Sequence, residues 1–393
     1  FFNQGGFSQF DIDGVRRLTV DGSARIKPQV AQWLAKARLL NAATGSKLSA
    51  NVSTGVQADN LAPKRSLSLG ASGVEGVKSD QNGRLRIQSG AEIDMGLRGS
   101  VTLLGGVGLE VDGAVRAAGG SITTGLVTPF VGGELDERLG GTCRFGAGAL
   151  LDVSGVTVLS ANNVGSQRFG SVLDGGVINV MTPVALQTTT PLVFERQVDK
   201  DGKVVKQATL LANGANGAID VRSQNAMGQV LVRRAELASN GGSINIQTGA
   251  QGGVLAADLQ AKAGGAGAQG GTLSVSINDF GSKKVPVVTL QIQQALAPQE
   301  LVEGKVVVSA DMVQAGGFAH LKLKSNDEIA TVGNVNLSVQ GDMTLDAPVL
   351  AARGNSQAVL AAAGRLARTN TDQVTGAQRV ATGGLGSVTL RGA

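Results

Sequence analysis

The sequence predicts an all-β solenoid, in which short strands stack coil upon coil around one narrow core. The first observation is a recurring box of a glycine, one further residue, and two aliphatic residues separated by a polar one. It reads Gly-Ala-Ile-Asp-Val at 217–221, Gly-Ser-Ile-Asn-Ile at 242–246 and Gly-Thr-Leu-Ser-Val at 271–275. Such an alternation behind a turn glycine is typical of a short strand with one buried and one solvated face.

The second observation is that similar boxes recur along most of the chain. Further examples begin at Gly83, Gly99, Gly176, Gly304, Gly333, Gly341 and Gly386. The five box glycines from Gly217 to Gly333 are spaced 25 to 33 residues apart. A spacing that drifts in this way predicts coils with insertions at their corners.

The third observation is the composition. The 393 residues include 58 Gly, 10 Phe, 1 Trp and no Tyr, so there are few bulky aromatic residues for one large globular core. The hydrophobic fraction of 42% is mostly aliphatic, which suits a thin, continuous core. The alternating β-branched runs and the charged fraction of 17% are the opposite of what is typical of a disordered chain. We therefore expect one continuous solenoid segment over residues 1–393, without internal domain boundaries.

The N-terminal elements follow in order. Residues 6–29 contain three alternating segments with Gly or Asp-Gly corners, which predict about one coil. Residues 28–43 have apolar residues at helical spacing after Pro28, so we expect a short helical excursion with Trp33 as its packing anchor. Residues 46–80 return to short strands with Ser- and Gly-rich corners.

The middle of the chain contains the densest run of predicted strands. Six strands are expected in 83–125, which at three per coil make about two coils. Residues 126–145 lack alternation and are expected to form a loop excursion. The stack resumes at Leu150-Leu151-Asp152-Val153-Ser154-Gly155. Residues 182–208 predict a hairpin excursion whose arms are 192–194 and 204–205 and whose charged tip is turned by Asp201-Gly202.

The C-terminal part is expected to return to regular coils. Residues 209–280 and 304–350 are read as coils, and 281–303 as a looser connection containing Pro286 and Pro298. The Ala-rich residues 356–368 fit a helix. The chain begins at Phe1-Phe2 and ends soon after a strand box, so both ends are expected to cut through a continuing repeat of a longer polypeptide.

Charge and cysteine content restrict the function classes. The net charge is +5, but the 35 basic residues are scattered in pairs such as Arg233-Arg234, which gives no support for nucleic-acid binding. Contact with acidic polysaccharide or envelope phosphates stays open. Cys143 is the only cysteine, so no disulfide pairing and no multi-cysteine metal site is expected. No run of 18 apolar residues occurs.

The search for catalytic or binding motifs yields only weak candidates. Gly265-Ala-Gly-Ala-Gln-Gly270 satisfies a dinucleotide pattern but leads into a predicted strand where that motif needs a helix. Gly105-Gly-Val-Gly-Leu-Glu110 approaches a calcium-binding repeat but occurs once. His320 is the only histidine and lies in a strand-like run. We expect no catalytic, cofactor-binding or metal site, and we read Cys143 as a buried small residue.

Isolated carboxylates leave one enzymatic alternative open. Polysaccharide lyases and hydrolases on a parallel β-helix need clustered carboxylates. The acidic residues of this chain stand singly along the sequence, as do Asp94, Asp112, Asp152, Asp220 and Asp346. Carboxylates of different coils can still lie close together in the folded chain. A cluster of carboxylates along a groove would favour an enzyme, and dispersed carboxylates would favour a rod.

Three stretches together resemble a known family. They are the Gly-Gly-Ser-Ile-Asn-Ile type boxes, Leu-Leu-Asp-Val-Ser-Gly at 150–155, and Gly-Gly-Phe-Ser-Gln-Phe-Asp-Ile-Asp-Gly at 5–14 followed by Leu-Thr-Val at 18–20. They are similar to the filamentous-haemagglutinin-like exoproteins of Gram-negative two-partner secretion. The resemblance spans essentially the whole chain, although the amino-terminal secretion domain of that family is not seen.

The resemblance implies both a fold and a role. The fold would be a right-handed parallel β-helix. The role would be that of a structural and adhesive shaft at the outer cell surface, without catalysis, that mediates attachment, cell–cell contact or biofilm formation. Its partners would be the outer-membrane secretion pore during export, glycans or proteins of host or bacterial surfaces, and further copies of itself. The alternatives are a polysaccharide lyase or hydrolase and the stalk of a contact-dependent toxin.

Overall fold

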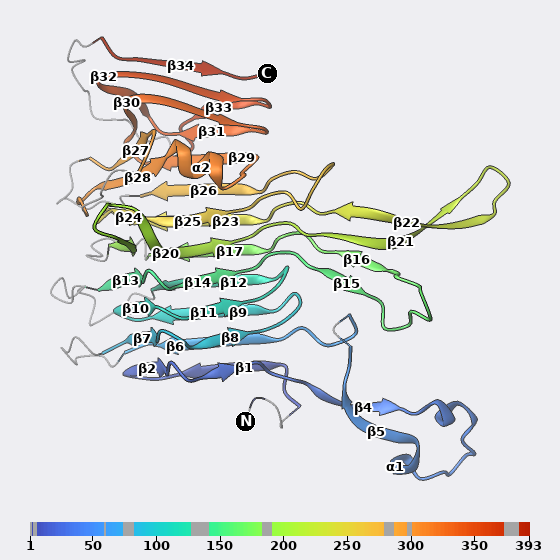
Figure 1. Ribbon diagram of the computed structural model, residues 1–393. Coiled ribbons are helices and arrows are strands. Elements are labelled where there is room, and N and C mark those ends of the chain that lie inside the picture. The colour runs from blue at the N-terminus through green and yellow to red at the C-terminus, as the bar shows by residue number, and fades with distance from the viewer. Residues whose placement is uncertain are drawn as a thin grey trace.

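The computed structural model describes residues 2, 6–58, 60–73, 82–126, 141–182, 191–278, 287–296, 301–372 and 385–393. Within these residues the chain is all-β and is built mainly of three long sheets of parallel strands (Figure 1). The strands are stacked one above another, with the N-terminal strands at the bottom of the stack and the C-terminal strands at its top.

The first two sheets run the length of the stack and the third ends at β25, and the strands of each are named in spatial order. The first contains β1 (Gln9–Asp13), β6 (Ser66–Ala71), β9 (Ser100–Gly105), β12 (Ser121–Leu126), β17 (Val177–Met181), β23 (Ser243–Thr248), β26 (Thr272–Ile277), β29 (His320–Ser325), β31 (Met343–Asp346) and β33 (Leu366–Thr369). The second contains β2 (Arg17–Val20), β7 (Arg84–Ile87), β10 (Gly108–Val111), β13 (Thr142–Phe145), β18 (Leu192–Phe194), β24 (Gly253–Leu255), β28 (Lys305–Ser309), β27 (Thr289–Gln293), β30 (Glu328–Val339), β32 (Val349–Ala362) and β34 (Ser387–Arg391). The third contains β3 (Arg25–Ile26), β8 (Glu92–Asp94), β11 (Ala114–Arg116), β14 (Leu150–Asp152), β20 (Val204–Leu211) and β25 (Ala257–Gln260), with β19 (Arg196–Val198) antiparallel to β20.

The chain visits the three sheets in a fixed cyclic order. The strands β1, β2 and β3 belong to the first, second and third sheets, and the same order recurs up to β23, β24 and β25. Each strand therefore pairs with strands one visit earlier and one visit later. All six strands expected between residues 83 and 125 are present, as β7 to β12.

Inward side chains stack in register from strand to strand and form one continuous core. In the first sheet Ile122, Ile178 and Ile244 lie opposite one another, and all three are fully buried. In the second sheet the rings of Phe145 and Phe194 stack with their centroids 4.8 Å apart. Burial of each such aliphatic side chain contributes roughly 1.5–3 kcal/mol, so the stack is stabilised along its whole length.

The box glycines are required by the close approach of successive strands' corners. A Cβ atom on Gly242 would meet the carbonyl oxygen of Gly176, and a Cβ on Gly271 would meet that of Gly242. The close approach also allows backbone hydrogen bonds between the corners. Ser243 N–H donates to Gly176 O and Thr272 N–H donates to Gly242 O, both at 2.9 Å. The recurring glycine therefore marks the point where one corner stacks on the next.

The regular order changes above β25. In the second sheet β28 lies between β24 and β27, although it follows β27 in sequence. Helix α2 (Ala310–Ala315) then packs against β25 and β30, where the regular order would place a strand of the third sheet. Its N-cap is Ser309, whose Oγ accepts the Met312 N–H at 3.2 Å. This helix was not predicted from the sequence.

The helical excursion expected at 28–43 is wrong. Residues Ala31–Ala35 form β4, which pairs antiparallel with β5 (Val52–Val56). Only a 3-10 turn, η1 (Ala37–Asn41), and one short helix, α1 (Leu48–Asn51), accompany it. Trp33 is 71% exposed and Leu40 is 92% exposed, so the expected packing anchor has no apolar surface to cover. Without such a surface a short amphipathic helix gains little, and strand pairing satisfies the backbone instead.

Two further excursions have different boundaries from those expected. In 126–145, Leu126 ends β12 and residues 142–145 form β13, while 127–140 lie outside the described residues. In 182–208 the first arm of the hairpin is β19, because Leu192–Phe194 is β18 of the second sheet. Leu192 and Phe194 are fully buried in the core, which explains their place in the stack. Residues 183–190 lie outside the described part.

Some expected coils and one expected helix are also corrected. The box at 217–221 lies in β21 (Asn216–Gln224), which pairs antiparallel with β22 (Val230–Ala238) and belongs to none of the three sheets. The Ala-rich residues 356–368 lie in β32 and β33 and the turn between them, not in a helix. The connection at 281–303 contains β27, and its residues 281–286 and 297–300 lie outside the described part.

Candidate functional site

The two candidate reactive side chains of the sequence are held in structural roles. Cys143 lies on β13 and is fully buried, and this burial raises the pKa of its thiol to about 12. A thiol with so high a pKa is protonated near neutral pH and is a poor nucleophile. His320 opens β29, and its Nδ1 accepts the Asp342 N–H at 3.0 Å. This hydrogen bond joins His320 to the connection between β30 and β31.

The five single carboxylates of the sequence do not gather in one site. Asp94 and Asp152 end equivalent strands of the third sheet, and each accepts the backbone N–H two residues later, from Gly96 at 2.8 Å and from Ser154 at 2.9 Å. Both carboxylates therefore shape a corner. Asp346 accepts the Thr371 N–H at 2.8 Å and thereby ties β31 to the residues after β33.

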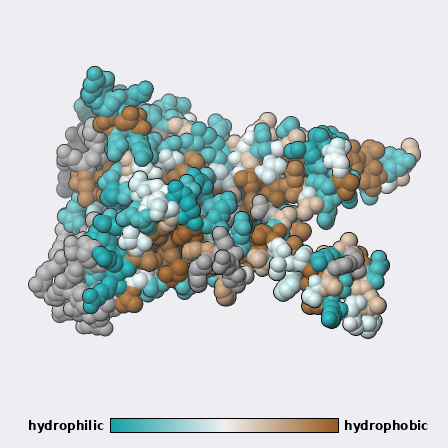
Figure 2. All heavy atoms as spheres, turned by 60° about the horizontal axis from the view of Figure 1, so that its bottom comes forward, coloured by the Kyte–Doolittle hydropathy of each residue, from teal (hydrophilic) through white to brown (hydrophobic). Residues whose placement is uncertain are grey.

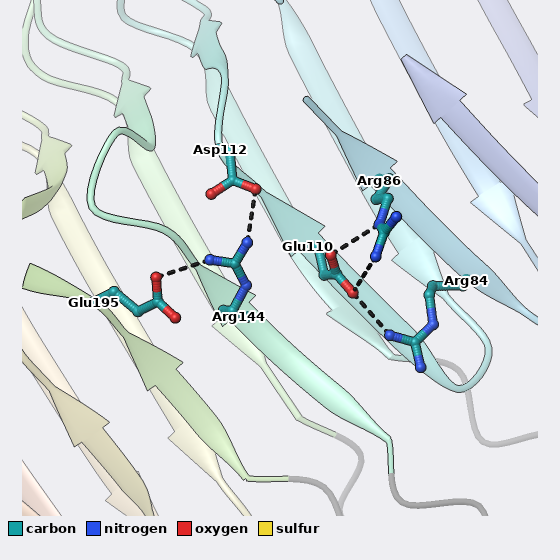
Figure 3. Close-up of polar contacts among 6 residues, drawn as sticks. All are labelled: Arg84, Arg86, Glu110, Asp112, Arg144 and Glu195. Carbon is teal, nitrogen blue, oxygen red and sulfur yellow. Dashed lines mark hydrogen bonds and ion pairs between the residues drawn. The ribbon is translucent and has the colours of Figure 1, made fainter. Parts of the chain in front are cut away.

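The outer face of the second sheet brings together charges that are far apart in the sequence (Figure 3). Glu110 on β10 accepts hydrogen bonds from Arg84 at 2.8 Å and from Arg86 at 2.9 Å. On the next strands Arg144 lies 2.8 Å from both Asp112 and Glu195. Asp112 and Glu110 stood out in the sequence but their arginine partners did not, because those partners are brought near only by the stacking of strands.

The electrostatics of Glu110 are those of a carboxylate held in its charged form. Burial raises the pKa of Glu110, but the hydrogen bonds and positive charges of Arg86 and Arg84 outweigh burial and hold it below its ordinary value. A general acid in glycoside hydrolysis needs the opposite shift. Within the described residues, Glu110 and its arginines thus form a cross-strand ion-pair ladder.

The glycine-rich motifs also have structural places. The residues after Gly265–Gly270 enter β26, a strand, as the sequence predicts. Glu110, the last residue of the second glycine-rich motif, is held by Arg84 and Arg86. Among the described residues no group of three or more His, Cys, Asp or Glu side chains is arranged to hold a metal ion. Across the same residues, helices long and apolar enough to cross a membrane are not found.

Three antiparallel excursions leave the stack at the same corner, between a strand of the third sheet and the next strand of the first. They are β4–β5, the hairpin of β15 (Thr157–Leu159) and β16 (Gly170–Val172), and the β21–β22 hairpin. In Figure 1 all three project to the same side. The corner they share therefore carries the parts of the chain that extend farthest from the sheets.

The β15–β16 and β21–β22 hairpins contact each other, and we call residues 157–172 with 216–238 the hairpin pair. Arg168 N–H donates to Asp220 Oδ2 at 2.7 Å, and Asp220 N–H donates to Arg168 O at 3.0 Å. Arg234 donates to Asp220 Oδ1 at 3.1 Å and to Ser166 O at 2.6 Å. The guanidinium of Arg222 lies 4.6 Å from the ring centroid of Phe169. Polar contacts thus fix the two hairpins to each other.

Beyond these contacts the hairpin pair exposes aliphatic side chains. Val230, Leu231 and Val232 are consecutive in β22 and are 51–59% exposed. Met227 at the tip of the hairpin is more exposed still. Figure 2 shows this hairpin as one of two arms that extend from the body, with hydrophobic atoms among hydrophilic ones. Exposed apolar residues gathered on a projecting element are typical of an interaction surface.

We predict that the Asp220 carboxylate titrates below its ordinary pKa. The hydrogen bonds from Arg234 and from Arg168 N–H lower this pKa. The stabilisation of the hairpin pair by Asp220 is therefore fully present above the ordinary pKa and is lost as the pH falls through the lowered one. A carboxyl-carbon NMR titration measures the midpoint. In Arg234→Gln the midpoint should rise toward the ordinary value, and an unchanged midpoint would contradict the assigned role of Arg234.

The comparisons with known proteins give no neighbour. No protein-family model, no curated protein and no solved structure matches the chain.

Proposed function

We propose that the chain is a segment of the shaft of a secreted, filamentous-haemagglutinin-like surface protein, coiled as a right-handed parallel β-helix. The observation that supports this most is the cyclic visiting order of three parallel sheets around a continuous aliphatic core. Connections between parallel strands of one sheet are right-handed in the great majority of cases, which favours the right hand for these coils. Such a coil has length and stiffness, and these are the properties of a spacer.

The proposed role is adhesion without catalysis, at the outer surface of a Gram-negative bacterium. The hairpin pair and the β4–β5 arm project away from the sheets (Figure 1), and they include exposed side chains such as Leu231 and Trp33. The proposed partners are glycans or proteins of host or bacterial surfaces, further copies of the chain, and an outer-membrane secretion pore during export. The paired state of Glu110, Asp112 and Glu195 supports a structural use of these carboxylates.

We predict that shortening the β21–β22 hairpin reduces attachment while the stack stays folded. Gly217 lies opposite Leu237, so replacing residues 218–236 by Asn-Gly closes the ladder with a two-residue turn. Binding of the labelled chain to bacterial and epithelial cells should fall by about tenfold or more, which corresponds to about 1.4 kcal/mol of binding free energy. Circular dichroism should keep its strand signal.

The matched control shortens another hairpin. Val198 lies opposite Val204, so residues 199–203 at the tip of β19–β20 can be replaced by Asn-Gly in the same way. Attachment should then be unchanged. Equal binding by the original chain and the 218–236 variant would overturn the adhesive role of the hairpin. Release of new reducing ends from a panel of bacterial and host polysaccharides would overturn the proposal of a non-catalytic shaft.

A further inference from the structure

We propose that strand β22 pairs antiparallel with β22 of a second copy of the chain, with Ala235 on the two-fold axis. The two edges of the hairpin differ. The β21 edge is covered by the β15–β16 hairpin through the contacts of Asp220 with Arg168. Among the described strands β22 pairs with β21 alone, so its other edge is open as far as Ala238; the next residue, Ser239, accepts the Gly264 N–H with its carbonyl oxygen. An unpaired edge strand is a template for another strand.

The direction of one amide shows which backbone groups are open. Asp220 N–H donates to Arg168 O, away from β22, and Asp220 lies opposite Arg234. Their pair is therefore of the non-hydrogen-bonded type, in which both residues turn their N–H and C=O groups outward. The same alternation turns the backbone groups of Val232 and Glu236 to the open edge. These groups are available to hydrogen-bond a second copy.

The pattern of charge selects the register. Two identical strands paired about a two-fold axis place one residue opposite itself, and Arg233 or Arg234 at that position would set like charges directly opposite each other. With Ala235 on the axis, Arg234 lies opposite Glu236 of the second copy, and the reverse pair forms as well. Glu236 is exposed and therefore accessible for this contact.

Arg234 already donates to Asp220 Oδ1 at 3.1 Å and to Ser166 O at 2.6 Å, and the proposed register adds Glu236 of the second copy as a further acceptor. The chain contains a precedent, because Arg144 lies 2.8 Å from both Asp112 and Glu195 on adjacent strands. A cross-strand pair of opposite charges favours the proposed register, and the two-fold axis produces the pair twice.

The extent of strand overlap favours the same register over an apolar one. With Ala235 on the axis, residues 232–238 of both copies pair, and the exposed Val232 lies opposite Ala238 of the second copy. An axis at Leu231 would match the exposed aliphatic residues, but only residues 230–232 of the two β22 strands would then overlap. Fewer paired residues mean fewer intermolecular backbone hydrogen bonds. The charge pattern and the overlap therefore select the same arrangement.

The β22 pairing specifies how two copies of the chain associate, and it rests on the proposed function only for that self-association. Self-pairing is measured with the isolated chain in solution, whereas attachment is measured on cells. A failure of one is therefore distinguishable from a failure of the other. The interface of one strand pair is small, so a weak dimer is expected and a trapping experiment suits it.

Disulfide trapping of Ala235→Cys tests the register. Opposite residues in a non-hydrogen-bonded pair have Cβ atoms about 4.5–5.5 Å apart, near the range that a disulfide spans. Under mild oxidation we expect a covalent dimer of twice the chain mass, formed at least about tenfold faster than in the control. The native Cys143 is fully buried and does not compete.

The matched control is Leu231→Cys on the same strand. In the proposed register the two Leu231 positions are eight residues apart along the strands, about 27 Å, so they should not cross-link. Trapping of Leu231→Cys in place of Ala235→Cys would overturn the register. Equal, slow oxidation of both variants would overturn the pairing itself.

Two second-site changes keep the test independent of folding defects in the cysteine variant. In the Ala235→Cys background, Val232→Pro removes an outward N–H but spares the bonds to β21, since proline is tolerated on the open side of an edge strand. Glu236→Lys places a cation opposite Arg234 of the second copy. Each change should slow trapping at least about tenfold. Trapping at an unchanged rate in both would overturn the proposal.

Discussion

Replacing Val275 by Asp should destabilise β26 and the strands that pair with it by about 4 kcal/mol or more, because it places a carboxylate in the dry core. Val275 is fully buried and lies in register between Ile246 of β23 and Leu323 of β29. Neither of these two neighbouring side chains is able to hydrogen-bond the new group. Hydrogen exchange of the β23, β26 and β29 amides measures the loss. The same result is expected for Ile244→Asp, one strand away.

The control for this prediction is the adjacent residue of the same strand. Ser274 points to the outer face of the first sheet and is partly exposed, so Ser274→Asp should change the free energy of unfolding by only about 0.5 kcal/mol. The two variants add the same charge one residue apart. Similar protection of the β26 amides in both would show that the inward and outward faces are wrongly assigned.

Replacing Arg353 by Met should destabilise the C-terminal strands by about 3 kcal/mol, because it removes both hydrogen bonds that this guanidinium donates to a buried carboxylate. Arg353 donates to both oxygens of Glu328, at 2.7 and 2.8 Å, and Glu328 is only 1% exposed. The pair joins β30 to β32 near the point where the register between them shifts, at Val332 and Asn334. Chemical denaturation followed by hydrogen exchange of these strands measures the change.

Two comparisons separate the loss of the pair from the loss of a side chain. The double variant Glu328→Leu with Arg353→Met should cost less than Arg353→Met alone, since it removes the buried charge together with its partner. Lys27→Met breaks the exposed pair with Asp94, at 3.0 Å, and should cost about 0.5 kcal/mol or less. A double variant less stable than the single one would contradict the role given to the pair.

The regular strands of the three sheets were predictable because alternation is a local property of the sequence. Residues 83–125 give six strands in the structure, and Ile244 and Val275 point inward as their boxes indicate. The box glycines were expected because each strand follows a tight turn. Their further role, the close stacking of Gly242 on Gly176, involves residues 66 positions apart and was not visible in the sequence.

The excursions show where local patterns are insufficient. The box at 217–221 alternates like any coil strand, but alternation does not specify the pairing partner, and β21 pairs antiparallel with β22. A signal for this hairpin does exist in the turn, where Asn225 Oδ1 accepts the N–H groups of Met227 and Gln229. At 28–43 the apolar spacing fits a helix, yet Trp33 is exposed and the residues pair as a strand.

The polar contacts of the candidate surfaces were the least predictable part. Arg144 reaches Asp112 and Glu195, which are 32 and 51 residues away in the sequence. Asp220 stood out as a single carboxylate, but its neighbours Arg168 and Arg234 lie in two different hairpins. Such contacts depend on the register between strands, which composition and motif spacing do not determine.

Distances between spin labels along the first sheet test the continuous stack of parallel strands most directly. Ser68, Ser274 and Thr344 occupy the same register position on the outer face of β6, β26 and β31, and the latter two strands lie five and seven strands from β6. With about 4.8 Å per strand, double electron–electron resonance should give about 24 Å for Ser68–Ser274 and about 34 Å for Ser68–Thr344. A Ser68–Thr344 distance equal to or shorter than Ser68–Ser274 would contradict one continuous stack.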